Sequence, residues 1–584
     1  MSSESITENE LVQDESSVWT LKDHRDFAYS EGAESERYLE RVLRTATDLG
    51  STSSELESHI KDWSSEYHLT TKRAQLLSGF KFDRSLRVLE VGCGCGAITR
   101  YLGETFDDVV SIEGSLHRAR LARLRTRDLP GVTIVCAPFQ DLRFSRKFDV
   151  IFCIGVYEYS SSFVDAADPY DAVLRYFSDM LTPNGIVVIA IENQFGLKYF
   201  SSATEDHVGV MFEGLEGYHS GLGKVRTFGK VELEHNLRRH FGWTTFYYPY
   251  PDYKLPDCVL AEELVASGAA GELVSQLKSR DYSGDRPALW DESLVTLELA
   301  KNAMLPFFAN SFLAVAGLGQ PAGLRFPQLG VIFSSGRAPM FRTKTTIARD
   351  SSGRVMVAKR GASGATAVNG RLRLVDTDSE WTGVPSLHTT VYARSRDRRA
   401  GLATIFEPCR GWAQLLQSRS AARDGDRFLG GEYLDWTWSN VYPAGNTYTA
   451  IDQEWVWGSD LRLNVLIVRA IHIFLLKARD AGRLPKRLRV SRGKTLIRDI
   501  ARTLGVELTN RDFADFIELE TELQSLAFGL SKRRQRRLAT VLRWSLRSRN
   551  SLELCLAVRR RAGGLLTRLT TKARSLLARR SVAA

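Results

Sequence analysis

Two acidic residues and three glycines near residue 100 have the spacing of a site for a small charged ligand. The run EVGCGCG, from Glu90 to Gly96, follows a short apolar segment and precedes a stretch with helical spacing. Alternating glycines let a backbone turn sharply and approach a ligand closely. The second acid, Glu113, ends another β-branched run, and a carboxylate in that place can accept both hydroxyls of a ribose. The pattern therefore predicts a site for a ligand that contains a nucleoside.

Two other kinds of site fit the same residues less well. A P-loop needs a Lys followed by Ser or Thr to cradle phosphates, and no such pair follows the glycines. Cys93 and Cys95 lie inside the loop but have no second pair at metal-ligand spacing, which argues against a zinc site.

The elements that must position this loop alternate between strands and helices. Stretches with helical spacing separate β-branched runs at 87–91, 108–112, 132–136, 148–154 and 185–191. This order predicts a parallel, doubly wound sheet of the α/β class, a Rossmann-like fold. We expect residues 35–80 to form helices before the sheet, and strands at 244–250 and 257–260 to close the domain.

The segment from about residue 85 to 200 resembles the class I S-adenosylmethionine-dependent methyltransferases. Their motif is an acid, three alternating glycines and a second acid that ends strand two; it is matched by Glu90, Gly92, Gly94, Gly96 and Glu113. The resemblance implies that Glu90 and the glycines hold the amino-acid part of S-adenosylmethionine and that Glu113 holds its ribose. A nucleotide fold that binds another ligand stays open as the alternative.

The same resemblance assigns further contacts to the cofactor. Phe139, Gln140 and Asp141 follow the third strand, where the family places its adenine contacts. Cys153 ends the fourth strand, which implies a place beside the reactive methyl group.

Methyl transfer from a sulfonium depends mainly on placing the acceptor in line with the methyl group. A base is needed only where the acceptor must lose a proton. Open α/β sheets bind ligands at the carboxyl ends of their strands, so our candidates follow strands four and five: Glu158, Tyr159, Asn193 and His207. Tyr157, Glu192, Lys198 and His219 lie in the same segments, and a structural role is the alternative for each residue.

Several phrases resemble a narrower family. They are WSSEYHL from Trp63, IENQFGLKYF from Ile191, EDH from Glu205 and YYPYPDYK from Tyr247. Together they are similar to bacterial surface-polysaccharide methyltransferases, including the bifunctional methyltransferase/kinase proteins that terminate O-antigen chains. This resemblance implies that Tyr67 and Arg73 help to cover the cofactor. Helix packing against the sheet is the alternative for Tyr67.

A second group of polar residues suggests phosphoryl transfer. Asp435 and Asn440 are five residues apart, and Asp452 follows a short strand-like run. Phosphoryl transfer from ATP uses a carboxylate facing the acceptor, an amide on Mg²⁺, and a second carboxylate that joins metal to phosphates. Lys359 directly follows the run VMVA. Its place is like that of the strand lysine that forms ion pairs with the phosphates of ATP.

Residues 325–530 therefore resemble the kinase-like domain of the same bifunctional family. We expect strands at 329–333, 341–348, 354–359 and 402–406, and a helix at 461–478. The departures are that no clear glycine-rich loop precedes Lys359 and that Tyr433 and Leu434 replace the usual His-Arg pair. An inert, kinase-like domain remains the alternative.

Length and charge complete the predicted organisation. A chain of 584 residues is too long for one hydrophobic core. We expect a disordered N-terminus (1–34), a methyltransferase domain (35–260), a helical connector (261–324), the kinase-like domain (325–530) and a basic amphipathic tail (531–584). The tail holds 16 Lys and Arg against one acid in a chain of net charge +10, so the rest is mildly acidic. Such a tail is typical of binding to an anionic membrane surface or a partner.

These patterns predict an enzyme that methylates a cell-envelope glycan or its phosphorylated end. One alternative is methylation of an unrelated small acceptor with an inert second domain, and another is a non-enzymatic scaffold that recruits glycosyltransferases at the membrane face. Scattered cysteines and a polar N-terminus favour the cytoplasm, with the tail on the inner face of the membrane. The expected cofactors are S-adenosylmethionine and, if the second domain is active, ATP with Mg²⁺. No aromatic ladder or zinc spacing supports nucleic-acid binding.

Overall fold

The computed structural model describes residues 7–22, 32–282, 289–319, 324–362, 364, 367–445, 447–480, 488 and 493–546. These residues form two compact units, which are described separately. The first comprises residues up to 335 together with 342–359; the second comprises 336–341 and the chain from 360 onward.

A parallel sheet forms the centre of the first unit. Its strands have the order β6-β5-β4-β7-β8, and every neighbouring pair is parallel. They are β4 (Arg87–Val91), β5 (Asp108–Glu113), β6 (Val132–Cys136), β7 (Phe148–Ile154) and β8 (Leu181–Glu192). The strand order reverses between β4 and β7, and ligands of open α/β sheets bind beyond the carboxyl ends of the strands at such a point. The predicted Rossmann-like fold is confirmed.

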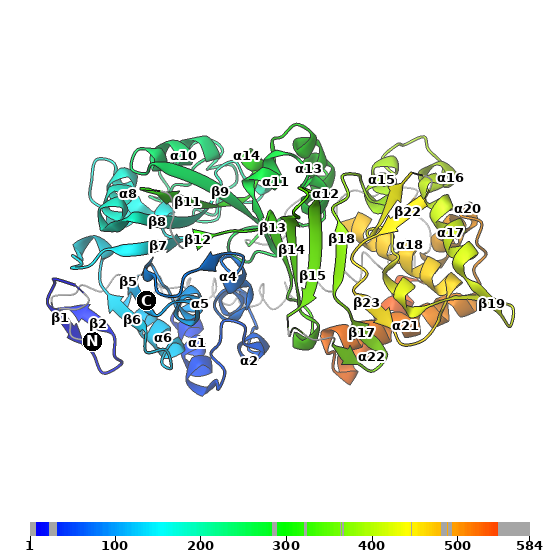
Figure 1. The fold of residues 1–584 in the computed structure, drawn as a ribbon, viewed down its shortest axis with the longest axis horizontal. Helices are drawn as coiled ribbons and strands as arrows, with labels where there is room; N and C mark the ends of the chain where they lie inside the picture. Colours follow the sequence, from blue (N-terminus) through cyan, green and yellow to red (C-terminus); the bar gives the residue numbers. More distant parts are fainter. Residues whose placement is uncertain are drawn as a thin grey trace, which may run out of the picture. The chain divides into compact units, whose positions relative to one another are not determined.

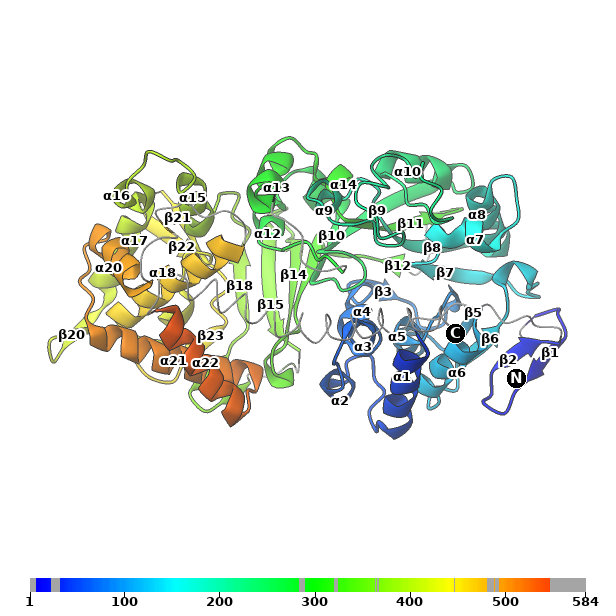
Figure 2. The same cartoon turned by 180° about the vertical axis from the view of Figure 1, so that it is seen from behind.

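Helices cover both faces of this sheet. Figures 1 and 2 show α5 (Ala97–Thr105) and α6 (Leu116–Arg125) on one face, with α8 (Pro169–Met180) and α10 (Lys230–Arg238) on the other. The expected helices before the sheet are α1 (Ala33–Thr45), α2 (Ser54–Ser58), α3 (Trp63–Leu69) and α4 (Lys72–Gln75). Short helices α7 (Ser160–Phe163) and α9 (Leu197–Phe200) follow β7 and β8.

Antiparallel strands extend the sheet beyond β8, which corrects two predicted boundaries. The order continues β8-β11-β9-β10-β13-β14-β15, with β9 (Trp243–Tyr250), β10 (Cys258–Ala261), β11 (Ser311–Gly317), β13 (Gly330–Ser334), β14 (Thr343–Arg349) and β15 (Val355–Gly361). Because β13 pairs with β10 and with β14, residues 325–359 largely belong to the first unit. The predicted start of the second domain at residue 325 is therefore wrong.

The segment 261–324 is not a purely helical connector either. It contains α11 (Glu262–Ala266), α12 (Gly271–Ser275), α13 (Glu292–Lys301) and α14 (Leu305–Phe308), but β11 is a fully buried strand between β8 and β9. Its small and apolar side chains fit between two other strands. The short strand β12 (Leu324–Arg325) pairs with β3 (Lys81–Phe82).

The N-terminus is ordered in part, where we expected disorder. Strands β1 (Leu11–Gln13) and β2 (Trp19–Leu21) pair with each other, and β2 lies parallel to β6 at the edge of the sheet. Val18 is fully buried in the main core of the first unit. Burial of this apolar side chain and pairing with an open sheet edge stabilise the hairpin against the entropy of the free chain.

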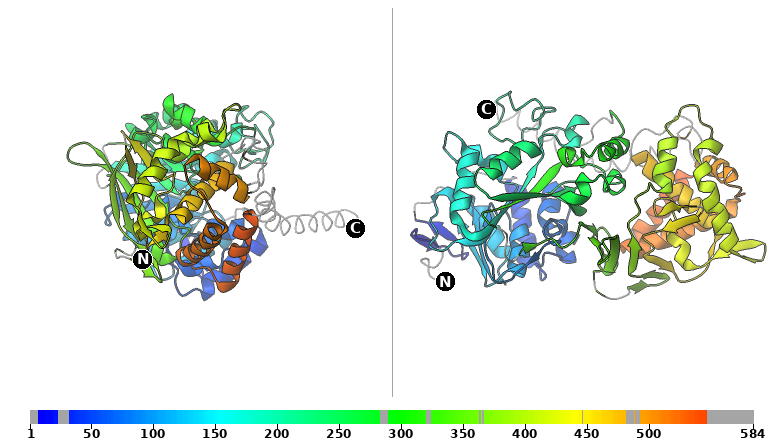
Figure 3. Two further views of the ribbon diagram at one scale, coloured as in Figure 1. Left: turned by 90° about the vertical axis from the view of Figure 1, so that its right-hand side faces the viewer. Right: turned by 45° about the horizontal axis from the view of Figure 1, so that its top comes forward.

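The second unit is mainly helical (Figure 3). Its helices are α15 (Leu387–Arg394), α16 (Leu402–Ile405), α17 (Arg410–Arg419), α18 (Leu463–Asp480), α20 (Gly493–Thr503), α21 (Asn510–Phe528) and α22 (Lys532–Ser545). Its strands are β16 (Val368–Asn369), β17 (Leu372–Leu374), β18 (Thr377–Glu380), β19 (Ala421–Arg423), β20 (Asp426–Leu429), β21 (Val441–Ala444), β22 (Thr447–Ala450), β23 (Trp455–Trp457) and β24 (Leu461–Arg462).

Two predictions for the second unit have opposite outcomes. The helix at 461–478 is confirmed as α18. The strand at 402–406 is wrong, because this apolar run forms the short helix α16, with Ile405 fully buried.

The basic tail begins as a packed helix. The first turns of α22 carry exposed cations, whereas Leu542 and Leu546 near its end are buried. Residues 531–546 are thus part of the second unit, and the predicted amphipathic segment around Leu565 lies outside the described residues. Membrane binding and a glycosyltransferase partner stay predictions. In the described part of the chain, no helix combines the length and apolar character needed to cross a bilayer.

Candidate functional site

The glycine loop between β4 and α5 has the backbone that its sequence predicts. Gly92, Gly94 and Gly96 all have positive φ angles, of 75°, 55° and 83°, which side chains rarely tolerate. A Cβ added to Gly96 would lie 2.8 Å from the Cα of Ala122 on α6, and one added to Gly92 would overlap Val156. The loop therefore requires glycine for conformation and for space.

Glu113, at the end of β5, holds this loop in place. Its Oε2 accepts a hydrogen bond from the Gly94 N–H at 2.7 Å, and its Oε1 accepts one from the Ser115 N–H at 3.1 Å. The side chain is 7% exposed. Each carboxylate oxygen has a second lone pair, so the carboxylate can also accept the ribose hydroxyls that the sequence assigns to it.

Glu90 is a buried acid beside the same loop. Its Oε2 accepts a hydrogen bond from Ser111 Oγ at 2.8 Å. Burial raises the pKa of Glu90 to about 7, although nearby Arg73 lowers it in part. The Arg73 guanidinium lies 4.3 Å from the centre of the Tyr67 ring and donates to the Lys254 carbonyl at 3.0 Å. Arg73 thus lies near Glu90 and holds Tyr67 beside it, and their covering role stays a prediction.

We expect the affinity for S-adenosylmethionine to fall as the pH drops below about 7. Burial raises the pKa of Glu90 to about 7. The ammonium group of the donor is predicted to bind the ionised carboxylate, so binding and loss of the proton should be linked. Below that pH the decrease in affinity should approach about tenfold for each further pH unit. Calorimetry from about 1.5 pH units below that pKa to about one unit above it checks this.

Glu90→Gln is the control for this prediction. It should bind the donor more weakly and show a flat profile over the same range. A wild-type affinity that does not change with pH would contradict the assigned role of Glu90.

The residues predicted to contact adenine begin a short 3-10 helix, η2 (Phe139–Asp141). The Phe139 ring is buried and packs against Phe163, Tyr176 and Phe177. Gln140 Nε2 donates to the Phe163 carbonyl at 2.9 Å. Their adenine contacts, and that of Asp141, remain predictions. Cys153 is buried near the end of β7, and its place beside the methyl group stays a prediction.

Three acids surround His207 beyond the ends of β7 and β8. His207 Nε2 lies 3.6 Å from Glu158 Oε1 and 3.7 Å from Glu192 Oε2, and its Nδ1 lies 2.9 Å from Glu205 Oε1. Burial alone would lower the pKa of His207, but the three carboxylates outweigh it and raise that pKa well above its usual value. Burial also raises the pKa of Glu158. Glu158 and His207, both predicted, thus lie together.

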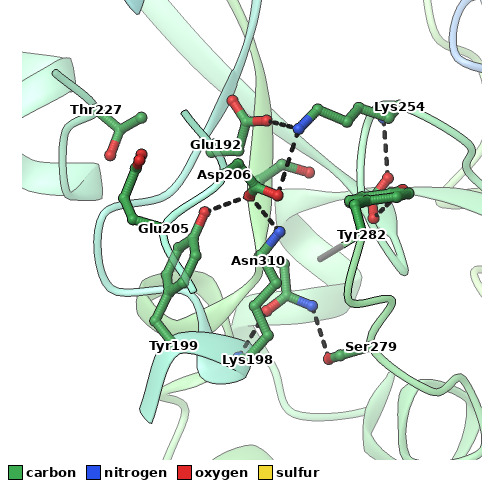
Figure 4. Close-up of polar contacts among 12 residues, drawn as sticks. Glu192, Lys198, Tyr199, Glu205, Asp206, Thr227, Lys254, Ser279, Tyr282 and Asn310 are labelled. Carbon is green, nitrogen blue, oxygen red and sulfur yellow. Dashed lines mark hydrogen bonds and ion pairs between the residues drawn. The ribbon is translucent and has the colours of Figure 1, made fainter. Parts of the chain in front are cut away.

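Two lysines, of which Lys198 is buried and Lys254 is partly exposed, extend this group of charges (Figure 4). Asp206 Oδ2 lies 2.5 Å from Lys198 Nζ and accepts a hydrogen bond from Tyr199 Oη at 2.6 Å. Lys254 Nζ lies 2.5 Å from Glu192 Oε1 and 3.5 Å from Asp206 Oδ1. Burial would raise the pKa of Asp206, but the two lysines hold it well below its usual value.

Tyr253 connects the charged group to the residues around the predicted donor site. Its Oη lies 3.5 Å from Glu158 Oε1, and the charge of Arg73 is close enough to lower its pKa, although burial raises that pKa overall. Gly155 has φ of 72°, and a Cβ there would lie 2.6 Å from Tyr253 Oη. The donor loop and the acid–histidine group therefore meet where the strand order reverses.

Tyr159 and Asn193, the other two residues predicted for methyl transfer, have different surroundings. The Tyr159 ring packs edge-on against His207, with 5.2 Å between ring centroids. Asn193 is fully buried, and its amide donates to the carbonyls of Phe307 and Ala309 while its Oδ1 accepts from the Phe195 N–H. Because backbone groups occupy the Asn193 amide, its role is to position the loop, and the catalytic prediction for it is wrong.

Glu205, Asp206 and Lys254 belong to this network although the sequence predicts no catalytic role for them. Tyr282 joins it as well, because its Oη donates to Asp252 Oδ2 at 2.7 Å. The sequence signal for the first three is the density of acids and tyrosines between residues 199 and 254.

The second unit brings together Asp435 and Asn440. Asp435 ends the 3-10 helix η6 (Gly431–Asp435), and its backbone carbonyl accepts from Asn440 Nδ2 at 3.3 Å. Burial raises the pKa of Asp435 to about 6, although Arg469, 3.2 Å away, lowers it in part. Asp452 follows the β21–β22 hairpin, whereas Lys359 lies on β15, in the first unit.

Comparison with known proteins finds a match for part of the first unit. A family model described as a methyltransferase domain matches residues 89–187, from β4 into β8. Cyclopropane-fatty-acyl-phospholipid synthase of Escherichia coli is 30% identical over 105 residues, which cover 18% of this chain and 25% of that protein. The chain spans about a quarter of the length of the curated relatives it matches.

Solved structures resemble parts of the chain. An N-methyltransferase from Bradyrhizobium japonicum is 21% identical with a TM-score of 0.18, and the match covers 21% of this chain and 64% of that one. An amino pentose methyltransferase from Micromonospora echinaspora is 27% identical with a TM-score of 0.16, and the match covers 18% and 42%. The family match shows that the chain carries a methyltransferase domain.

Proposed function

We propose that this protein transfers the methyl group of S-adenosylmethionine to a hydroxyl of a cell-envelope glycan. The observation that carries the proposal is the buried group Glu158, Glu192 and His207 beyond β7 and β8. It follows the carboxyl ends of β7 and β8, and the segment after β7 contacts the glycine loop where Val156 lies against Gly92. Such a group can take a proton from a neutral acceptor, and a hydroxyl must lose its proton when it is methylated.

In the absence of a bound cation, the charge of the site favours a neutral acceptor over the phosphorylated end of a glycan. Four carboxylates (Glu158, Glu192, Glu205 and Asp206) lie among three cations (Lys198, Lys254 and His207). Even with His207 protonated, three positive charges leave one negative charge uncompensated. A buried site of negative charge repels an added phosphate strongly, because screening by water is weak there.

The reaction then needs only positioning and one proton transfer. The acceptor oxygen attacks the methyl carbon in line with the sulfonium sulfur, the C–S bond breaks, and the donor leaves as a neutral thioether. Glu158 accepts the hydroxyl proton, and Glu192 and His207 fix its orientation. The resemblance to polysaccharide methyltransferases at Tyr67, Glu205–His207 and Tyr247–Lys254 supports the glycan as acceptor.

Label transfer tests the acceptor. The full-length protein is incubated with S-adenosylmethionine carrying a tritiated methyl group and with the envelope polysaccharide of cells that lack the gene. We expect label in the polysaccharide that survives cold aqueous hydrofluoric acid, which cleaves phosphate diesters but not methyl ethers. Label released by this treatment would show the phosphorylated end to be the acceptor, and label found only in small molecules would contradict a glycan.

A second candidate function, phosphoryl transfer, is favoured by the order of residues in the second unit. Asp435, Asn440, the β21–β22 hairpin and Asp452 follow one another as a phosphotransferase loop requires. If this unit transfers phosphate from ATP with Mg²⁺, Asp435→Asn should lower the rate about 100-fold or more, because the acceptor loses its base. Transfer from radiolabelled ATP to the polysaccharide measures the rate.

Asn is preferred to Ala at position 435 because it keeps the contact with buried Arg469. A melting temperature equal to that of the wild type confirms that the variant folds. Equal rates, or no transfer by either protein, would show that the second unit is an inert domain.

A further inference from the structure

The acid–histidine group has the geometry of a metal site. In the described part of the chain, Glu158, Glu192 and His207 form the one group in which three potential ligand atoms lie within 4.8 Å of one another. His207 Nε2 is 3.6 Å and 3.7 Å from the two carboxylate oxygens. Ligands about 2.0–2.2 Å from a tetrahedral ion are about 3.3–3.6 Å apart. An ion therefore fits between them with little movement.

Three carboxylate oxygens of this group accept no hydrogen bond. They are Glu158 Oε2 and both oxygens of Glu192, on residues that are 0% and 1% exposed. Buried polar atoms without a partner are rare because desolvation is costly. Glu192 Oε2 is also the oxygen that faces His207 Nε2, since its Oε1 is taken by Lys254. Unpartnered Glu192 Oε2 thus faces the centre of the group, whereas Glu158 turns Oε1 towards His207 Nε2 and leaves Oε2 unpartnered.

His207 is oriented as metal-bound histidines are. Its Nδ1 contacts Glu205 Oε1 at 2.9 Å, and a carboxylate on the far nitrogen is the usual second partner of a histidine ligand. Glu205 is itself fixed, because its Oε2 accepts the backbone N–H groups of His207 and Val208 at 2.7 Å and 2.6 Å. The arrangement leaves Nε2 directed at Glu158 and Glu192.

We propose that Glu158, Glu192 and His207 bind a divalent cation, Mn²⁺ or Zn²⁺, which holds the acceptor hydroxyl for methyl transfer. One imidazole and two carboxylates suit these ions better than Mg²⁺, which prefers oxygen ligands alone. Three protein ligands leave a coordination position for substrate. The role of the ion rests on the methyl transfer proposed above.

The ion promotes loss of the acceptor proton. A hydroxyl bound to a divalent cation has a lowered pKa. Its proton passes to the unpartnered Glu158 Oε2, the oxygen attacks the methyl carbon, and the C–S bond breaks to give a methyl ether and a neutral thioether. Charge and atoms balance without another reactant.

Mn²⁺ binding tests the site. Full-length protein, treated with chelator and dialysed, is titrated with Mn²⁺, and free Mn²⁺ is followed by electron paramagnetic resonance; Zn²⁺ then competes. We expect one tightly bound ion in the wild type and an affinity lowered by about tenfold or more in both His207→Ala and Glu192→Gln. His219→Ala, an exposed histidine of the same segment, is the matched control and should bind as the wild type does.

The outcomes separate this proposal from the proposed function. A wild type that takes up neither Mn²⁺ nor Zn²⁺, or folded variants that bind like the wild type, would overturn the metal site. Melting curves identify a variant that does not fold, and Glu158→Gln then replaces it. Calorimetry of the metal-free protein with S-adenosylmethionine is independent of the ion, so loss of donor binding would count against the function alone.

Discussion

Glu113→Ala is expected to bind S-adenosylmethionine at least about 100-fold more weakly than the wild type. The carboxylate is predicted to accept two ribose hydroxyls, and hydrogen bonds to a charged group contribute about 1.5–3 kcal/mol each. The variant also removes the acceptor of the Gly94 and Ser115 N–H groups, so the loop itself becomes less ordered. Calorimetric titration measures both affinities.

Asp107→Ala is the matched control. Asp107 directly precedes β5, at the end opposite Glu113, and its exposed side chain pairs with exposed Arg84. Such surface pairs contribute little to stability, so donor affinity should not change. If Glu113→Ala binds as tightly as Asp107→Ala, the donor is not held by the acid at the end of β5.

Glu158→Gln is expected to lower the rate of methyl transfer by about 100-fold to 10,000-fold, the usual range for loss of a general base. Gln has the same shape but cannot accept the hydroxyl proton. The affinity for S-adenosylmethionine should stay as in the wild type, because Glu113 and the glycine loop are unchanged. Initial rates with the tritiated donor and the envelope polysaccharide measure the effect.

Asp165→Asn provides the comparison for this second variant. Asp165 is exposed in the segment that follows β7, so its loss removes the same charge outside the site. A Glu158→Gln protein that transfers methyl groups as fast as Asp165→Asn would show that the proton leaves by another route.

The sequence was sufficient for the donor half of the site because its residues are local. Glu90, the glycines and Glu113 lie within one strand–helix–strand unit. The positive φ angles at Gly92, Gly94 and Gly96 could be predicted because glycine is the residue that adopts them readily. The strands β4 to β8 were predictable for a similar reason. Parallel strands buried on both faces are continuous apolar runs.

The acceptor half depends on contacts between distant segments. His207 contacts Glu158 and Glu192, and Tyr282 reaches Asp252 at 2.7 Å; nothing in their spacing predicts these pairs. β11 was missed because an Ala-containing apolar run of seven residues suits a helix or a strand equally well, and only its two neighbouring strands decide. The same ambiguity explains the wrong strand at 402–406.

Mass spectrometry of envelope glycans from cells with and without the gene tests the central claim most directly. Glycans from cells with the gene should carry methyl ethers that are missing without it. The wild-type gene should restore them and the Glu113→Ala gene should not. Identical glycans from both kinds of cell would contradict the proposal that this protein methylates a cell-envelope glycan.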